Sequence, residues 1–244
     1  MTLSEWHQTQ KRFFDDTAHE YGANFEQDNP YFRFVIDHYV DAIRCEAGEK
    51  ILEIGASGGR FTVPLLDRGC KVTGVDLSAK SFEHLERQVA SHPHRGNLRL
   101  IEDDASSFSR LEDRDFDAVV GAHILHHVED IRKVLAQALG RLRPGGRAVF
   151  LEPNPWNPQW YVHMTIHPRK SWRVEKGFLR MWPGAVRRMF LESGFSECRV
   201  CAFGCFPPFI LNNIPGSRAL ERLIERCGPV SRLLTLNIFS ARKA

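Results

Sequence analysis

The 244-residue chain lacks any run of about 18 apolar residues, so the sequence predicts no transmembrane helix. Its first residues, MTLSEWHQTQKRFFDD, are polar and include acids, which argues against a secretory signal. The six cysteines are scattered rather than dense, unlike those of a small disulfide-stabilised domain. We therefore expect a cytoplasmic protein with reduced thiols.

Three cysteines, Cys198, Cys201 and Cys205, have a spacing that suggests a metal or iron–sulfur site. They lie in the apolar run CRVCAFGCF, which is typical of a strand in a core. We favour core packing for these residues.

The net charge is only +3, but it is divided unevenly. Residues 167–244 contain 14 basic and 5 acidic residues, which leaves the first 166 residues at −6. A basic segment of this kind favours an anionic substrate or a membrane surface. A solvated charged face explains it equally well.

A strand, a glycine turn and a helix follow one another between residues 50 and 65. Ile51, Leu52 and Ile54 predict a short strand, residues 55–59 contain three glycines, and an apolar helix face begins at Phe61. Glycines let the backbone approach a ligand closely, and the N–H groups of the new helix attract a carboxylate or phosphate.

The next predicted strand, residues 70–76, ends on Asp76. A carboxylate at this point can accept hydrogen bonds from both ribose hydroxyls, so the two segments predict a nucleoside site. The dinucleotide motif G-x-G-x-x-G fails, because Ser57 and Arg60 replace its second and third glycines.

The residues Glu53, Gly55, Ser57 and Gly59 resemble motif I of the class I S-adenosylmethionine-dependent methyltransferases, an acid followed by G-x-G-x-G. Ser57 replaces the middle glycine and tolerates positive φ less well, although Gly58 lies beside it. A phosphate-binding or purely structural turn is the alternative.

Further segments resemble the same family in the same order. Asp104-Ala105, after a predicted strand at 97–101, stands where the family binds the adenine amino group, with Asp103 as the near alternative. The strand 116–121, FDAVVG, and the segment PGGRAVFL match later parts of the pattern. An aromatic residue in the position of Tyr21 folds over the cofactor in this family. Packing of that tyrosine between helix and sheet is the other interpretation.

The resemblance implies S-adenosyl-L-methionine as the cofactor. The residues that it assigns to cofactor binding are Tyr21, Glu53, Gly55, Ala56, Ser57, Gly59, Asp76, Leu77, Asp104, Ala105 and His123.

Three histidines, His123, His126 and His127, follow the fourth predicted strand. In related quinone O-methyltransferases the corresponding loop carries Glu, Glu and His. The departure from that acidic pattern argues against a metal-assisted mechanism, and we assign no metal ligand, although three imidazoles can bind a transition metal.

A histidine suits the role of a general base at neutral pH. His123 leads the candidates because it comes directly after the strand. The other candidate catalytic residues, each of which also has a structural interpretation, are His126, Glu152 and His163.

The fold expected from the resemblance is α/β: a Rossmann-like, seven-stranded, mostly parallel sheet with an antiparallel last strand, helices on both faces and a helical cap. Residues 1–48 form N-terminal helices and a lid, 49–154 the cofactor-binding core, 155–182 an inserted acceptor-binding cap, and 183–244 the rest of the core. A dimer surface is the alternative role for the cap. The last strand, 233–241, is expected at the sheet edge.

An apolar segment, 206–211, precedes a helix at 217–227 with Leu220, Leu223, Ile224 and Cys227 on one face. These residues suggest an oily acceptor or peripheral contact with a bilayer, and packing over the sheet is the simpler explanation.

The predicted activity is in-line transfer of a methyl group to a small acceptor, hydrophobic or lipid-, quinone-, polyketide- or sugar-like. The alternatives are an NAD(P)-dependent oxidoreductase, opposed by the failed glycine motif, and a non-catalytic cofactor-binding protein. Asn154-Pro155-Trp156 only loosely resembles the N/D-P-P-Y/F motif of nucleic-acid amino methyltransferases, and it follows the fifth strand, whereas that motif belongs after the fourth. Nucleic acid is therefore not an expected partner. The sequence leaves open the acceptor atom and whether the protein is a monomer or a homodimer.

Overall fold

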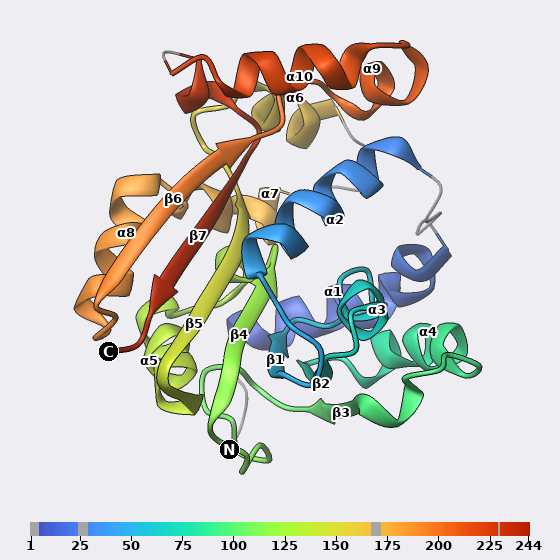
Figure 1. Ribbon diagram of the computed structural model, residues 1–244, viewed down its shortest axis with the longest axis vertical. Coiled ribbons are helices and arrows are strands. Elements are labelled where there is room, and N and C mark those ends of the chain that lie inside the picture. Colours follow the sequence, from blue (N-terminus) through green and yellow to red (C-terminus); the bar gives the residue numbers. More distant parts are fainter. Residues whose placement is uncertain (1–4, 24–28, 167–171, 229) are drawn as a thin grey trace.

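The computed structural model describes residues 5–23, 29–166, 172–228 and 230–244. Within these ranges seven strands form one sheet in the order β3-β2-β1-β4-β5-β7-β6 (Figure 1). The strands are β1 (Lys50–Ile54), β2 (Lys71–Asp76), β3 (Leu98–Glu102), β4 (Phe116–Ala122), β5 (Leu142–Pro153), β6 (Glu197–Phe203) and β7 (Leu236–Arg242).

The first five strands pair in parallel, whereas β7 is antiparallel to both β5 and β6. This confirms the expected mostly parallel sheet with an antiparallel last strand. The expected edge position of that strand is wrong, because β7 lies between β5 and β6 and leaves β6 at the edge. The reason is burial: Leu236, Ile238 and Phe239 are at most 4% exposed, and an interior position covers them on both sides.

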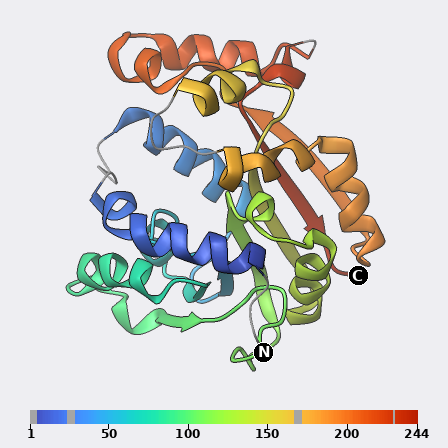
Figure 2. The same cartoon turned by 180° about the vertical axis from the view of Figure 1, so that it is seen from behind.

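Helices cover both faces of the sheet (Figures 1 and 2). Leu52 and Ile54 point into a core shared with α5 and α8, whereas Ile51 points into a second core shared with α2, α3 and α4. The described α-helices are α1 (Glu5–Ala23), α2 (Pro30–Ile43), α3 (Thr62–Asp67), α4 (Ala79–Val89), α5 (Ile131–Arg141), α6 (Pro158–Ile166), α7 (Trp172–Glu175), α8 (Pro183–Glu192), α9 (Pro208–Asn213) and α10 (Ser217–Glu225).

Local sequence signals explain where α2 begins and how it packs. Asn29 caps the helix by accepting a hydrogen bond from Tyr31 N at 3.0 Å, and Pro30 occupies the first turn. The fully buried Tyr39 donates its hydroxyl to Val149 O at 3.0 Å, which attaches α2 to β5.

The order of the strands places a crevice at the carboxyl ends of β1 and β4. These two strands are neighbours, and the chain proceeds from them to opposite halves of the sheet. In open α/β sheets ligands bind at such a switch point. The glycine turn after β1 and the histidine segment after β4 therefore meet at the same place.

Three details of the C-terminal part differ from the sequence-based expectations. The apolar segment after β6 contains the short helix α9, which the sequence did not predict. On α10, Leu220 and Leu223 face outward and are 49% and 66% exposed, because Glu221 and Glu225 occupy its inner face. Core packing holds for Cys198 but not for Cys201, which is exposed. Among the described helices, none is long and apolar enough to cross a membrane.

Candidate active site

The turn after β1 requires glycine at two positions. Gly55 has φ +76°, and a side chain there would lie 3.2 Å from Ile124 of the opposing loop. Gly59 has φ +91°, and a Cβ there would lie 2.4 Å from Leu85 of α4. Ser57 adopts φ +45° between them, so the middle position of the motif is left-handed without being a glycine.

The carboxylate of Asp76 faces this turn from the end of β2. It accepts hydrogen bonds from Ser57 N and from Ser78 N, each at 3.0 Å. Burial raises the pKa of Asp76 to about 6, despite these N–H donors. The side chain lines the main cavity together with Ala56 and Leu77, as the nucleoside interpretation requires.

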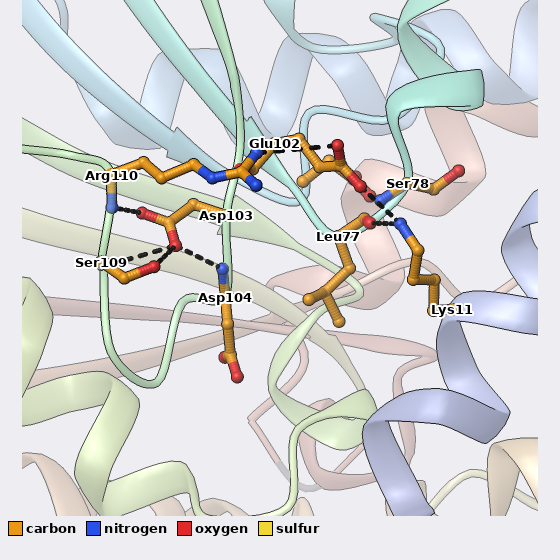
Figure 3. Close-up of polar contacts among 9 residues, drawn as sticks. Lys11, Leu77, Ser78, Glu102, Asp103, Asp104, Ser109 and Arg110 are labelled. Atoms are coloured by element: carbon orange, nitrogen blue, oxygen red, sulfur yellow. Dashed lines mark hydrogen bonds and ion pairs between the residues drawn. The ribbon is translucent and has the colours of Figure 1, made fainter. Parts of the chain in front are cut away.

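The two neighbouring acids after β3 have different roles (Figure 3). The carboxylate of Asp103 is used within its own loop, where it accepts hydrogen bonds from Ser109 and from the N–H groups of Arg110 and Asp104. Asp104 instead contacts His7 Nδ1 at 3.2 Å and accepts from Ser106 N. These interactions outweigh burial and lower the pKa of Asp104 to about 2.

Helix α1 packs beside α4 and α7 (Figure 2). Lys11 Nζ donates to Leu77 O at 2.5 Å and to Glu102 at 2.6 Å, which attaches α1 to the ends of β2 and β3 (Figure 3). Ser78 donates its hydroxyl to Asp15 at 2.6 Å. His7, Gln10 and Phe14 line the cavity. The side chain of Tyr21, the predicted lid residue, lies outside the described residues.

Glu53 does not line the cavity. It is 3% exposed and accepts a hydrogen bond from the Thr62 hydroxyl at 2.6 Å. Burial, and the nearby carboxylate of Asp76, raise the pKa of Glu53 to about 8. Its position beneath the turn indicates that it supports the glycine turn, because its carboxyl group is directed toward α3.

His123 begins the segment after β4 in a left-handed conformation, φ +55°. Its N–H donates to Leu151 O at 2.7 Å. The ring lines the cavity with Trp160 and His163 of α6, and its centroid lies 6.5 Å from that of Trp160. The structure thus brings two predicted catalytic histidines, far apart in the sequence, to one wall.

Glu152 lies behind this wall. It is fully buried, and it accepts hydrogen bonds from Ile124 N and Leu125 N and contacts His126 Nδ1 at 2.6 Å. Burial lowers the pKa of His126, but Glu152 and Glu175 outweigh it and raise that pKa to about 9. Glu152 therefore orients His126 rather than reaching the cavity, because both of its oxygens are occupied.

The cavity has a volume of about 900 Å³ and extends from Asp76 and Asp104 past His123 to α6 and α7. Its walls include residues that the sequence did not single out. Arg60, packed over the Phe32 ring at 4.4 Å, is one of them, and it follows the glycine turn directly. Others from distant segments are Gln10, Phe14, Glu175 and Phe178, whereas Phe206 comes from the apolar segment for which the sequence suggested an oily acceptor. Gly59, Glu53 and Glu152 are not among the described lining residues.

Comparison with known proteins finds similarity to methyltransferases. Residues 52–150 match the family model described as "Methyltransferase domain". The chain is 29% identical over 152 residues to a ubiquinone biosynthesis O-methyltransferase of Idiomarina loihiensis, a match covering 61% of this chain and 59% of that protein. It is 27% identical over 206 residues to a highly reducing polyketide synthase of Leptosphaeria maculans, covering 75% of this chain and 8% of the synthase. The chain thus spans 54–64% of the length of the ubiquinone biosynthesis O-methyltransferases that it matches.

Solved structures share the fold. Phosphoethanolamine N-methyltransferase 2 of Haemonchus contortus, in complex with S-adenosyl-L-methionine, superposes with a TM-score of 0.66 at 16% identity, covering 99% of this chain and 60% of that one. N-methyltransferase NodS of Bradyrhizobium japonicum, in complex with S-adenosylhomocysteine, gives 0.60 at 17% identity, covering 98% and 99%. Residues 52–150 thus match a methyltransferase domain, and the chain shares its fold with these two N-methyltransferases.

Proposed function

We propose that the protein transfers a methyl group from S-adenosyl-L-methionine to a small acceptor. The observation that supports this most is one continuous cavity with two chemically different ends. Asp76, Asp104 and the turn at 55–59 form the polar end, and His123, Trp160 and His163 form the other. An enzyme that joins a nucleoside cofactor to a second substrate needs both ends within one enclosure.

The residues at the polar end fit the cofactor. Gly55 and Ala56 leave room for a close backbone approach, Asp76 is suited to the ribose hydroxyls, and Asp104 to the adenine amino group. The cofactor supplies a methyl group already activated on a sulfonium. Leu77, Ser57 and Ala105 complete the proposed cofactor wall, while Glu53 and Gly59 act by shaping the turn.

The acceptor end is mostly apolar, with Trp160, Met164, Phe178 and Phe206 in its wall. It therefore favours a small hydrophobic acceptor, and the names of the ubiquinone and polyketide relatives point in the same direction. Three of these residues belong to the segment 155–182, which supports its role as the acceptor-binding cap. We keep 1–48, 49–154 and 183–244 as lid, cofactor-binding core and remaining core.

His123 is the proposed general base, and His163 the second candidate, because both rings line the acceptor end. A base that removes the acceptor's proton can add about 10²–10⁴-fold to the rate. Positioning of the acceptor in line with the methyl group supplies more, about 7–11 kcal/mol in favourable cases. His126 is held by Glu152, so Glu152 serves as a positioning residue.

Calorimetry with S-adenosylmethionine, S-adenosylhomocysteine and NAD tests the cofactor assignment. We expect binding of the first two and none of NAD, and the opposite selectivity would favour the oxidoreductase alternative. A screen of phenolic, quinol, polyketide and sugar acceptors with methyl-labelled cofactor then tests catalysis. Binding without transfer to any acceptor class would favour a non-catalytic cofactor-binding protein.

We also propose that α10 contacts an anionic membrane surface. Glu221 accepts hydrogen bonds from Cys205 N and Phe206 N, so the acid is turned inward. The outer side then carries Leu220 and Leu223 beside the exposed Arg222 and, directly after the helix, the exposed Arg226. Such a pairing of apolar and basic residues suits the interface of an anionic bilayer.

Sedimentation with phosphatidylserine-containing vesicles, compared with neutral ones, tests this contact. We expect the double substitution Leu220→Ser with Leu223→Ser to abolish binding, whereas Leu179→Ser, at another exposed leucine, leaves it unchanged. Equal binding to both vesicle types would contradict the electrostatic part. A cytoplasmic location, supported by six free cysteines, and a monomeric or homodimeric state complete the proposal.

A further inference from the structure

Three buried ligand atoms converge at the cap end of the cavity. His126 and His127 lie in the 3₁₀ turn Leu125–His127, and Glu175 ends α7. One ligand atom from each lies within 4.8 Å of the others, and the residues are 3%, 8% and 7% exposed. All three also line the cavity. The cluster is thus enclosed on one side and open to a small molecule on the other.

The hydrogen bonds around His126 determine which atoms are available. Its Nδ1 is occupied by Glu152 at 2.6 Å, which leaves Nε2 directed at Glu175 Oε2, 3.4 Å away. The Nε2 of His127 lies 3.9 Å from the same oxygen. The Nε2 atoms of both imidazoles therefore lie around one carboxylate oxygen.

A metal ion can bind all three atoms together, because they lie within 4.8 Å of one another. In a tetrahedral zinc site with bonds of about 2.0–2.2 Å, ligand atoms are separated by about 3.3–3.6 Å, close to both distances. We propose that His126, His127 and Glu175 bind a divalent transition-metal ion such as Zn²⁺. Two imidazoles with one carboxylate favour such an ion over Mg²⁺ or Ca²⁺.

Neighbouring residues hold the ligands of the cluster in place. Glu152 holds His126 from behind, as carboxylates commonly hold a metal-ligating histidine. The cap is fastened to the histidine segment by Arg180, which donates to Val128 O at 2.5 Å. Gly177 permits the close approach of the cap to the histidine segment, because a Cβ there would lie 1.7 Å from His126 O. The metal-binding atoms of the turn Leu125–His127 and of α7 are therefore held in one arrangement.

Three protein ligands leave a coordination position for a water or substrate oxygen. Because His126, His127 and Glu175 also line the cavity, a small molecule bound there could reach that position. The site therefore suits an acceptor with a hydroxyl, phenolic or carboxylate oxygen. Metal binding by these residues does not depend on the proposed methyl transfer.

The test uses the full chain, treated with chelator, dialysed and titrated with Zn²⁺ by calorimetry, with Co²⁺ absorption as a spectroscopic readout of coordination. We expect about one ion per chain and a tetrahedral Co²⁺ spectrum. Glu175→Gln and His127→Ala should each weaken binding at least tenfold and alter that spectrum. Glu152→Gln should weaken it by about 10–100-fold, the range for residues behind a ligand.

His94→Ala is the matched control, because it removes an exposed imidazole outside the cluster and should leave affinity unchanged. Circular dichroism verifies that each variant is folded, and Zn²⁺ should raise the Tm of the wild type but not of Glu175→Gln. Absence of Zn²⁺ binding by the wild type would overturn the proposal. Unchanged binding by folded Glu175→Gln and His127→Ala would overturn it as well. Both measurements are made without S-adenosylmethionine, so their outcome does not depend on whether the protein transfers methyl groups.

Discussion

Replacement of Asp76 by Asn should weaken binding of S-adenosylmethionine by about 10–100-fold. The carboxylate already accepts N–H groups from Ser57 and Ser78, and its remaining acceptor capacity faces the cavity. Asn replaces one carboxylate oxygen with a donor. One hydrogen bond to a charged group contributes about 1.5–3 kcal/mol, and each 1.4 kcal/mol is about tenfold in Kd.

The same carboxyl group gives the wild type a pH signature. Because the pKa of Asp76 is raised to about 6, the group loses its charge as pH falls through 6. Affinity should then decline toward about tenfold per pH unit below that value, whereas the Asn variant keeps a flat profile.

Calorimetry from pH 8 to pH 5 measures both effects, with Asp113→Asn, at a site exposed and away from the cavity, as the control. A folded Asp76→Asn protein whose Kd changes less than about threefold would refute the ribose assignment. A wild-type affinity independent of pH would refute the assignment of the titrating group.

Other predictions concern the base, the lid and the cap. His123→Asn, chosen because Asn tolerates the left-handed conformation, should lower kcat by about 10²–10⁴-fold in a methyl-transfer assay at saturating cofactor. An unaltered kcat would dismiss His123 as the base. The hydrogen bond with Asp104 raises the pKa of His7 although burial opposes it, and the pKa of Asp104 is lowered to about 2. The pair therefore stabilises the fold most between pH values of about 3.9 and 6.5, the unfolded pKa values of the two groups. This stabilisation is lost as pH falls through the folded pKa of Asp104 or rises through the folded pKa of His7. His7→Ala should lower Tm in that window and much less at pH 9, and an equal loss at both pH values would contradict the ion pair. Gly177→Ala should destabilise the protein by about 1–3 kcal/mol in urea unfolding, because its Cβ meets His126 O, whereas Gly184→Ala, with open space around it, should be tolerated; equal stability of the two variants would show that the cap is not tightly packed there.

The sequence by itself determined the parts of the site that depend on local order. Strand, glycine turn and helix follow from residues 50–65, and Asp76 ends the next strand, because apolar periodicity and glycine positions are local signals. The spacing also predicts a nucleoside site rather than a pyrophosphate site. Asp104 was preferred to Asp103 on the family pattern, and the structure supplies a reason: Asp103 is committed to the N–H groups of its own loop.

Only the tertiary structure decided which distant segments share the cavity. His7 meets Asp104, Glu175 meets His126, and Glu152 turns away from the cavity toward the N–H groups of residues 124 and 125. Tertiary structure also decided that β7 lies between β5 and β6 and that the leucines of α10 face outward. The physical reason is that local patterns record which face of an element is apolar, whereas the partner of a side chain depends on long-range packing and on buried polar groups finding hydrogen bonds.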